Sequence, residues 1–251
     1  MKKKEYFLNM PTEFLDPDFL NRNGLTRKLY VTHLMIDRWR TVDEYSKISL
    51  RELLNYVGSQ ETRKSSTICQ DFLHCLTYMI ESNMIEVIGN PNINEIYHYD
   101  SITLKIIDRR FYGDGTFVGI TTEQFELIPK ISGNKKPENV LAVLLFMLSR
   151  MWRKGNKVTY NTRPEAYYFG VKLIHKALNM SKRVAEECID ILTSATEEYP
   201  PILIKYTRTS SRAYRNIYVI NKEGYEEEIK NALDAINRYN PMGEFEVPDF
   251  W

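Results

Sequence analysis

The sequence predicts an α+β, mainly helical protein made of two copies of one domain, each with three helices followed by a β-hairpin. A weak internal duplication is the first observation: FLNMPTEF from Phe7 and FVGITTEQF from Phe117 share Phe, Thr and Glu at a constant offset of 110 residues (117 minus 7). Each copy precedes an apolar segment, LTRKLYVTHLMIDRWR or NVLAVLLFMLSRMWR. Such repetition indicates repeated structural units. We therefore expect domains over residues 1–110 and 111–240, followed by a tail over 241–251.

The composition is that of a globular protein. Of the 251 residues, 43% are hydrophobic and 27% charged, so we expect a packed core in both copies. The start, MKKKEYFLNM, lacks the apolar stretch of a signal peptide, and the longest apolar run, VLAVLLFML, is too short to span a bilayer. We expect a cytoplasmic protein with no membrane association, in which Cys69, Cys75 and Cys188 are reduced residues on helix faces.

The first copy contains three helical patterns and a hairpin pattern. Apolar residues recur at helical spacing from Leu25 to Trp39, and every fourth residue is apolar in TICQDFLHCLTYMIE. Between these segments, Ser49 and Glu52 form an S-x-x-E capping box, which predicts a short second helix. MIEVI and EIYHY flank a Gly-Asn-Pro-Asn turn and predict a β-hairpin. This is the element order of a winged-helix (helix-turn-helix) domain, in which the hairpin is the wing.

The second copy repeats this order. EAYYFGVKLIHKALN and SKRVAEECIDILTSA predict the second and third helices, and PILIKYTRTSSRAYRNIYVIN predicts the hairpin. EGYEEEIKNALDAINRYN predicts a final helix. The fold class is therefore two tandem winged-helix domains, with an acidic and aromatic tail.

LNMSKRVAEECIDIL resembles the turn and recognition helix of bacterial helix-turn-helix domains. A recognition helix contacts DNA through its N-terminal turn, so the resemblance makes Ser181, Lys182 and Arg183 the contact candidates. Glu186 and Glu187 depart from the pattern, because acidic side chains facing the DNA would repel phosphates. The alternative is an ordinary amphipathic helix with a good N-cap.

In the first copy, the segment GSQETRKSSTICQDFL separates the second and third helices by a longer loop. Short hydroxyl and amide side chains there suit phosphate and base-edge contacts, and they are equally common as helix caps. The candidate DNA-binding residues of this segment are Arg63, Lys64, Ser65, Ser66, Thr67 and Gln70.

The second hairpin carries the strongest local positive charge, although the net charge of the whole chain is only +1. Between residues 205 and 215 there are four basic residues and no acid, interleaved with Tyr206 and Tyr214. We expect a cationic finger that lies along the phosphate backbone or enters a minor groove; the alternative is a solvated edge hairpin. The basic residues are Lys205, Arg208, Arg212 and Arg215.

Sequence signals for catalysis are absent. The chain contains no phosphate-binding GxxxxGK[ST] or GxGxxG motif, no HExxH zinc motif and no GxSxG nucleophile motif. The four histidines are scattered over different expected elements. We therefore expect a protein that is not an enzyme and that uses no metal ion or cofactor.

FLNMPTEFL, followed by a winged-helix pattern, resembles the start of the replication initiators and replisome organisers of bacterial plasmids and phages. The resemblance covers about residues 5–90. It implies binding of double-stranded origin DNA and recruitment of a helicase or helicase loader. Both a monomer and a homodimer are consistent with it. The alternatives are a transcriptional repressor, or a winged-helix interaction module that binds protein and no DNA. The tail GEFEVPDFW is acidic, so we expect it to contact protein: a second subunit, a replication partner or its own domain.

Overall fold

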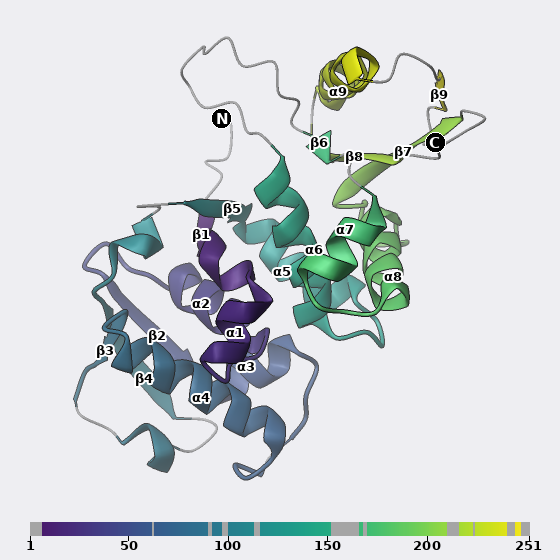
Figure 1. Cartoon of the computed structure of the whole chain (residues 1–251). Helices are drawn as coiled ribbons and strands as arrows, with labels where there is room; N and C mark the ends of the chain where they lie inside the picture. Colours follow the sequence, from purple (N-terminus) through teal and green to yellow (C-terminus); the bar gives the residue numbers. More distant parts are fainter. Residues whose placement is uncertain are drawn as a thin grey trace. The chain divides into compact units, whose positions relative to one another are not determined.

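A computed structural model of the chain describes residues 7–61, 63–89, 92–96, 100–112, 116–151, 166–167, 170–209, 216–222, 224–239 and 244–246. In these ranges the protein is α+β, with helices and small antiparallel sheets (Figure 1). The chain divides into two compact units, unit 1 (Met1–Leu145) and unit 2 (Phe146–Trp251). Within the described ranges, every helix is too short or too polar to cross a membrane.

Unit 1 opens with a two-stranded ribbon made by the two duplicated segments. β1 (Phe7–Pro11) pairs antiparallel with β5 (Phe117–Thr121), and Asn9 lies opposite Gly119 at the centre. Because these two residues are separated by the same 110 positions as the duplication (119 minus 9), the two copies meet about a local two-fold axis. The expected boundary between residues 110 and 111 therefore differs from the structural division, since pairing with β1 holds β5 in unit 1.

Different helices follow the two strands of the ribbon. β1 leads into a short 3-10 helix (Thr12–Leu15) and α1 (Pro17–Arg22). β5 leads into α5 (Thr122–Ile131), whose N-cap Thr121 forms a capping box with Gln124. The structural correspondence thus covers the strands only, because the matched Thr–Glu pairs begin a 3-10 helix after β1 and an α-helix after β5.

The rest of unit 1 has the order helix, strand, two helices and two strands. The buried faces of α2 and α4 pack together, and they cover one face of a sheet with strand order β2-β4-β3. The sheet's other face carries exposed Tyr45, Lys47 and Lys105. The elements are α2 (Lys28–Arg38), β2 (Tyr45–Ser49), α3 (Leu50–Tyr56), α4 (Thr67–Glu81), β3 (Ile85–Val87) and β4 (Ser101–Ile106).

The first hairpin differs from its expected position. Its second strand is β4, whereas Glu95 of the expected EIYHY strand lies in a 3-10 helix (Ile93–Glu95) and residues 97–99 lie outside the described residues. SITLKI forms the strand because Ile102, Leu104 and Ile106 alternate toward the core. A further short 3-10 helix, Arg109–Tyr112, follows β4.

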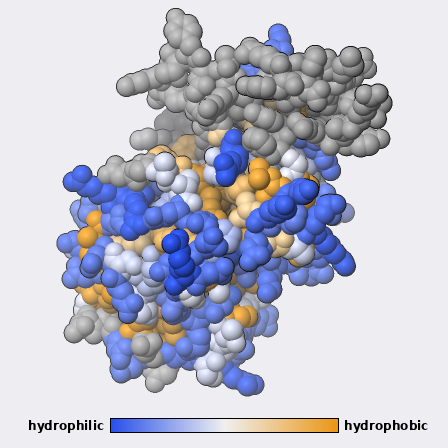
Figure 2. Space-filling view, viewed as in Figure 1, coloured by the Kyte–Doolittle hydropathy of each residue, from blue (hydrophilic) through white to orange (hydrophobic). Residues whose placement is uncertain are grey.

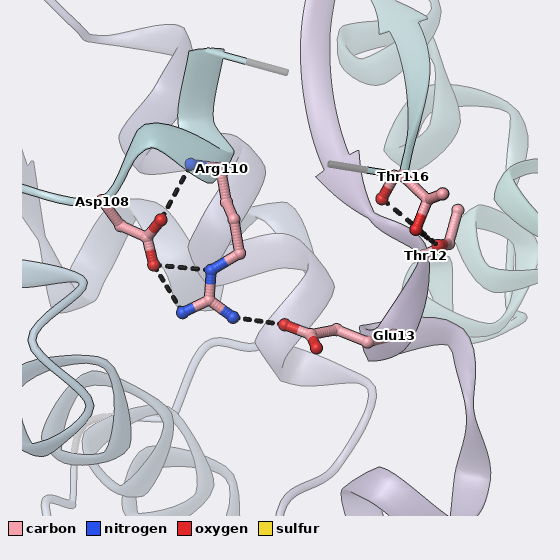
Figure 3. Close-up of polar contacts among 5 residues, drawn as sticks. All are labelled: Thr12, Glu13, Asp108, Arg110 and Thr116. Carbon is pink, nitrogen blue, oxygen red and sulfur yellow. Dashed lines mark hydrogen bonds and ion pairs between the residues drawn. The ribbon is translucent and has the colours of Figure 1, made fainter. Parts of the chain in front are cut away.

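An ion-pair group lies close to the ribbon. Arg110 pairs with both Asp108 and Glu13, and the Thr12 hydroxyl lies 2.9 Å from that of Thr116 (Figure 3). Although partial burial opposes it, the Arg110 guanidinium holds the pKa of the Asp108 carboxyl below its usual value. These contacts connect the start of the chain to residues about a hundred positions later, so they fix the ribbon in place.

The segment from α6 to β8 repeats the order of the segment from α2 to β4, and a final helix and strand follow it in unit 2. Its sheet has the strand order β6-β8-β7-β9. The elements are α6 (Pro137–Arg150), which spans the division, β6 (Ala166–Tyr167), α7 (Val171–Ala177), α8 (Lys182–Thr193), β7 (Leu203–Thr209), β8 (Asn216–Ile220), α9 (Tyr225–Tyr239) and β9 (Glu244–Glu246).

The helix expected over EAYYFGVKLIHKALN is shorter in the structure. Its start forms β6, and α7 begins only after Gly170, the N-cap residue with φ −70° and ψ 158°. Ala166 and Tyr167 pair with Val219 and Tyr218 of β8. The strand therefore occupies the place that β2 holds beside β4 in unit 1.

Both faces of the unit 2 sheet are covered by helices. Ile204, Tyr206, Ile217 and Val219 form a buried cluster with Ile229 and other residues of α9. The alternate residues include buried Leu203 and Tyr218, on the side of α8. In Figure 1, α9 and α8 lie on opposite sides of these strands.

Candidate nucleic-acid interface

The N-terminal turn of α8 is polar and exposed. The Ser181 hydroxyl accepts a hydrogen bond from the Val184 amide at 3.2 Å, so this side chain caps the helix as well as being a contact candidate. Ser181, Lys182 and Arg183 are all exposed, whereas Ala185 and other apolar residues of the helix are buried. The structure therefore brings these three candidates together at the solvent-exposed end of one helix.

Two ion pairs follow along the same helix. Lys182 Nζ lies 3.2 Å from Glu186 Oε1, and Arg183 Nε lies 3.1 Å from Glu187 Oε1. The two basic side chains are 66% and 87% exposed, and pairs of this kind contribute only about 0.3–0.5 kcal/mol each. Both cations can therefore leave their glutamates for a stronger anion at little cost.

The preceding helix adds two basic residues that the sequence reasoning missed. Lys172 and Lys176 are exposed on α7, and only a short turn containing Asn179 (φ 45°) separates α7 from α8. The signal was present in the sequence, because the two lysines are four residues apart and share one helix face. Four cations thus lie on two adjoining helices.

The first-copy candidates gather at the N-terminus of α4. The Ser66 hydroxyl accepts from the Cys69 amide at 3.4 Å and caps the helix, while Gln70 Nε2 donates to the Lys64 carbonyl at 2.7 Å and closes the loop. Arg63, Ser65, Thr67 and Gln70 are exposed, and Lys64 is half-buried. This end of α4 offers mainly hydroxyl and amide groups, in contrast to the cations of α8.

The second hairpin forms with β7 and β8 as its strands. Lys205 lies opposite Tyr218 and is half-buried; Arg208 lies near the end of β7; Arg212, Tyr214 and Arg215 fall outside the described residues. Tyr206 does not belong to the exposed finger as expected. It is buried in the cluster under α9, and burial raises the pKa of its hydroxyl above the usual value. The reason is that α9 covers the sheet face to which Tyr206 belongs.

A buried polar group in unit 1 is a second site that could have carried chemistry. The His33 ring stacks on Phe111 at 4.0 Å, and its Nε2 bonds the Asn9 carbonyl oxygen at 2.8 Å. The Asp37 carboxylate accepts from the Asn9 amide at 2.8 Å and lies 3.2 Å from Arg40. Both side chains bind the backbone of β1 and are buried, so the group fixes the strand and offers no reacting atom to a substrate.

Perturbed pKa values in this group have the same structural cause. Burial lowers the pKa of His33 to about 3 and raises that of Asp37 to about 6, which leaves the imidazole neutral at pH 7. Within the described part of the chain, no three His, Cys, Asp or Glu side chains gather as a metal site would require. Cys69, Cys75 and Cys188 are buried free thiols on α4 and α8, as expected.

Comparison with known proteins gave no match, either among protein-family models or among curated proteins. Most of the visible described surface is hydrophilic (Figure 2), which suits a polar interface better than an apolar one. The candidate contact surfaces are the exposed end of α4 in unit 1 and, in unit 2, the exposed end of α8 with the β7–β8 hairpin.

Proposed function

We propose that the protein binds double-stranded DNA as two tandem winged-helix domains, through the N-terminal turns of α4 and α8 and the β7–β8 hairpin. One observation carries the proposal: the segments from α2 to β4 and from α6 to β8 both have the order helix, strand, helix, helix, strand, strand, and in both the first strand of this order pairs with the last. This agreement supports a duplicated winged helix, in which α4 and α8 hold the place of the recognition helix.

The position of the basic residues in α8 supports the proposal. The N-terminus of a helix carries partial positive charge, so cations there are unfavourable and helices usually begin with acids. Lys182 and Arg183 occupy the first turn of α8 all the same. Cations at this unfavourable position have a functional explanation when an anion, such as a DNA phosphate, binds beside them.

The role of this binding is proposed from the resemblance to plasmid and phage replication initiators. In that role the protein binds origin DNA and recruits a helicase or loader, with a transcriptional repressor as the alternative within DNA binding. The bound site distinguishes them: selection of sequences from genomic DNA returns an origin for an initiator and a promoter for a repressor.

The ion pairs on α8 favour one alternative outside DNA binding, a winged-helix module that binds protein, because Glu186 and Glu187 neutralise the two cations in the free protein. The two functions separate in one experiment. Binding of the purified full chain to random and selected duplexes is measured for the wild type, Lys182→Ala, Arg183→Ala and, as a control, Lys230→Ala. Lys230 is exposed on α9, which covers the sheet face opposite α8.

The proposal predicts that Lys182→Ala and Arg183→Ala weaken binding to the selected duplex more than to random DNA, by about tenfold or more if base contacts are lost. Lys230→Ala should bind both duplexes as the wild type does. Absence of duplex binding by the wild type would leave the interaction module as the function, and equal losses for all three variants would reject α8 as the interface.

A further inference from the structure

The acidic tail supplies a strand to the sheet that forms the wing. β9 pairs antiparallel with β7, with Glu246 opposite Thr207, Phe245 opposite Arg208 and Glu244 opposite Thr209 (Figure 1). β8 pairs with Leu203–Thr207, so β9 lies along the part of β7 that leads to the hairpin tip. The expected hairpin edge is therefore occupied by the chain itself.

The charges of the two segments are opposite. From residue 244 to the end, the chain carries Glu244, Glu246 and Asp249 and no basic residue, whereas residues 205–215 carry four basic residues and no acid. An acidic strand beside a basic hairpin lowers the positive potential that would attract a phosphate backbone. The acidic strand also pairs with the edge of β7 that faces away from β8.

The pairing is short enough to be displaced. Three residue pairs at a sheet edge contribute little stability by themselves, and a strand joined to the same chain returns quickly because its effective concentration is high. A tethered strand of this kind alternates between bound and released states under equilibrium control.

We infer that β9 and DNA compete for the wing, so that the acidic tail inhibits DNA binding until it is displaced. The inference rests on the proposed DNA-binding function of the hairpin. If β9 occupies the edge about nine-tenths of the time, the apparent Kd for DNA is weakened about tenfold, because only the released fraction binds.

A reversible cross-link tests the competition directly in the full chain. Thr207→Cys and Glu246→Cys place two thiols at directly opposed positions, a spacing that permits a disulfide. The matched control is Lys47→Cys with Thr103→Cys, a directly opposed pair on β2 and β4 of unit 1. Binding to one fixed duplex is measured for both proteins, oxidised and reduced.

We expect the oxidised Thr207–Glu246 pair to bind DNA at least about tenfold more weakly than its reduced form, while the control pair binds equally in both states. A chain truncated after residue 240, which retains the whole of α9, should bind more tightly than the full chain, and the gain should shrink as salt rises.

The outcomes separate the two proposals. Equal DNA binding by locked, reduced and truncated proteins, or failure of the test pair to cross-link when the control pair does, overturns the competition alone. Loss of DNA binding from every form, truncated chain included, overturns the proposed function.

Discussion

The segments from α2 to β4 and from α6 to β8 have the same element order, but the sheets of the two units are covered differently. In unit 1 the β2-β4-β3 sheet buries one face, and the other presents Tyr45, Lys47 and Lys105 to solvent. In unit 2 the sheet is covered by α9 on the corresponding side and gains β9 at its edge. Their strand sequences reflect this: SITLKI alternates, whereas NIYVI is apolar through its centre.

The comparison shows that one topology can present two chemically different surfaces. The α4 end of unit 1 offers hydroxyl and amide groups with one exposed cation, Arg63, whereas α7 and α8 of unit 2 offer four exposed cations. Hydroxyls and amides suit base edges and positioning, and cations supply affinity through phosphates. We therefore propose that unit 2 provides most of the electrostatic affinity.

The largest expected effect is on stability at the covered face of the unit 2 sheet. Ile217 is fully buried under α9, so Ile217→Ala should lower the free energy of unfolding of unit 2 by about 2–5 kcal/mol. Lys105→Ala, on the open face of the unit 1 sheet, should change stability by less than about 0.5 kcal/mol. Hydrogen exchange of the strand amides measures both; similar losses of protection would remove the distinction between covered and open faces.

The second prediction concerns pH and the polar group on β1. The unfolded chain protonates His33 near pH 6.5 but the folded chain only near 3, so this residue makes stability fall as pH drops through that interval. Asp37 acts in the opposite direction, because its folded pKa of about 6 exceeds the usual 3.8, and stability rises as pH falls from 6 to 4. The two contributions nearly cancel in the wild type between pH 6 and 4.

Single substitutions should separate the two opposed dependences of stability on pH. In His33→Gln, the stability of unit 1 should rise as pH falls from 6 to 4, and in Asp37→Asn it should fall, each by up to about 1.4 kcal/mol per pH unit. Denaturant titrations at several pH values, with hydrogen exchange of β1 to assign the change to unit 1, provide the measurement. Parallel pH dependence in the two variants would show that burial does not shift these groups as described.

The smallest expected effects are at the starts of the second helices. Ser49 and Glu52 form a full capping box on α3, so Ser49→Ala should destabilise unit 1 by about 1 kcal/mol. Gly170 at the start of α7 makes no side-chain cap and has open space around its Cβ position, so Gly170→Ser should stabilise unit 2 by a few tenths of a kcal/mol. Thermal unfolding that shifted downward in both variants would contradict this contrast.

Periodic helices and their caps were predictable from the sequence. TICQDFLHCLTYMIE forms α4 over its whole length, and the Ser49 capping box is present. The buried stripe of α4 is wider than the expected every-fourth pattern, because Cys69, Leu73 and Met79 face the core while Ile68 and Ile80 are only half-buried. Local spacing predicts a helix, but the surface on which it packs decides its buried face.

Short strands and their partners were not predictable in the same way. β2 and β6 went unrecognised, since five residues and two residues carry little periodic signal before a partner strand is known. The pairing of β1 with β5 joins segments more than a hundred residues apart, and nothing local specifies it. Of the candidate interface, the end of α8 was visible as a motif, whereas the burial of Tyr206 and the position of β9 depend on tertiary packing.

The salt dependence of duplex binding tests the central claim most directly. If unit 2 neutralises about four phosphates, the logarithm of affinity should fall against the logarithm of salt concentration with a slope near −3 to −4. The double variant Arg208→Ala, Arg212→Ala of the hairpin should reduce the slope's magnitude by about 2, whereas Ser65→Ala with Thr67→Ala at the start of α4 should leave it unchanged. A binding constant that does not change with salt, or a slope that Arg208 and Arg212 do not affect, would contradict the account.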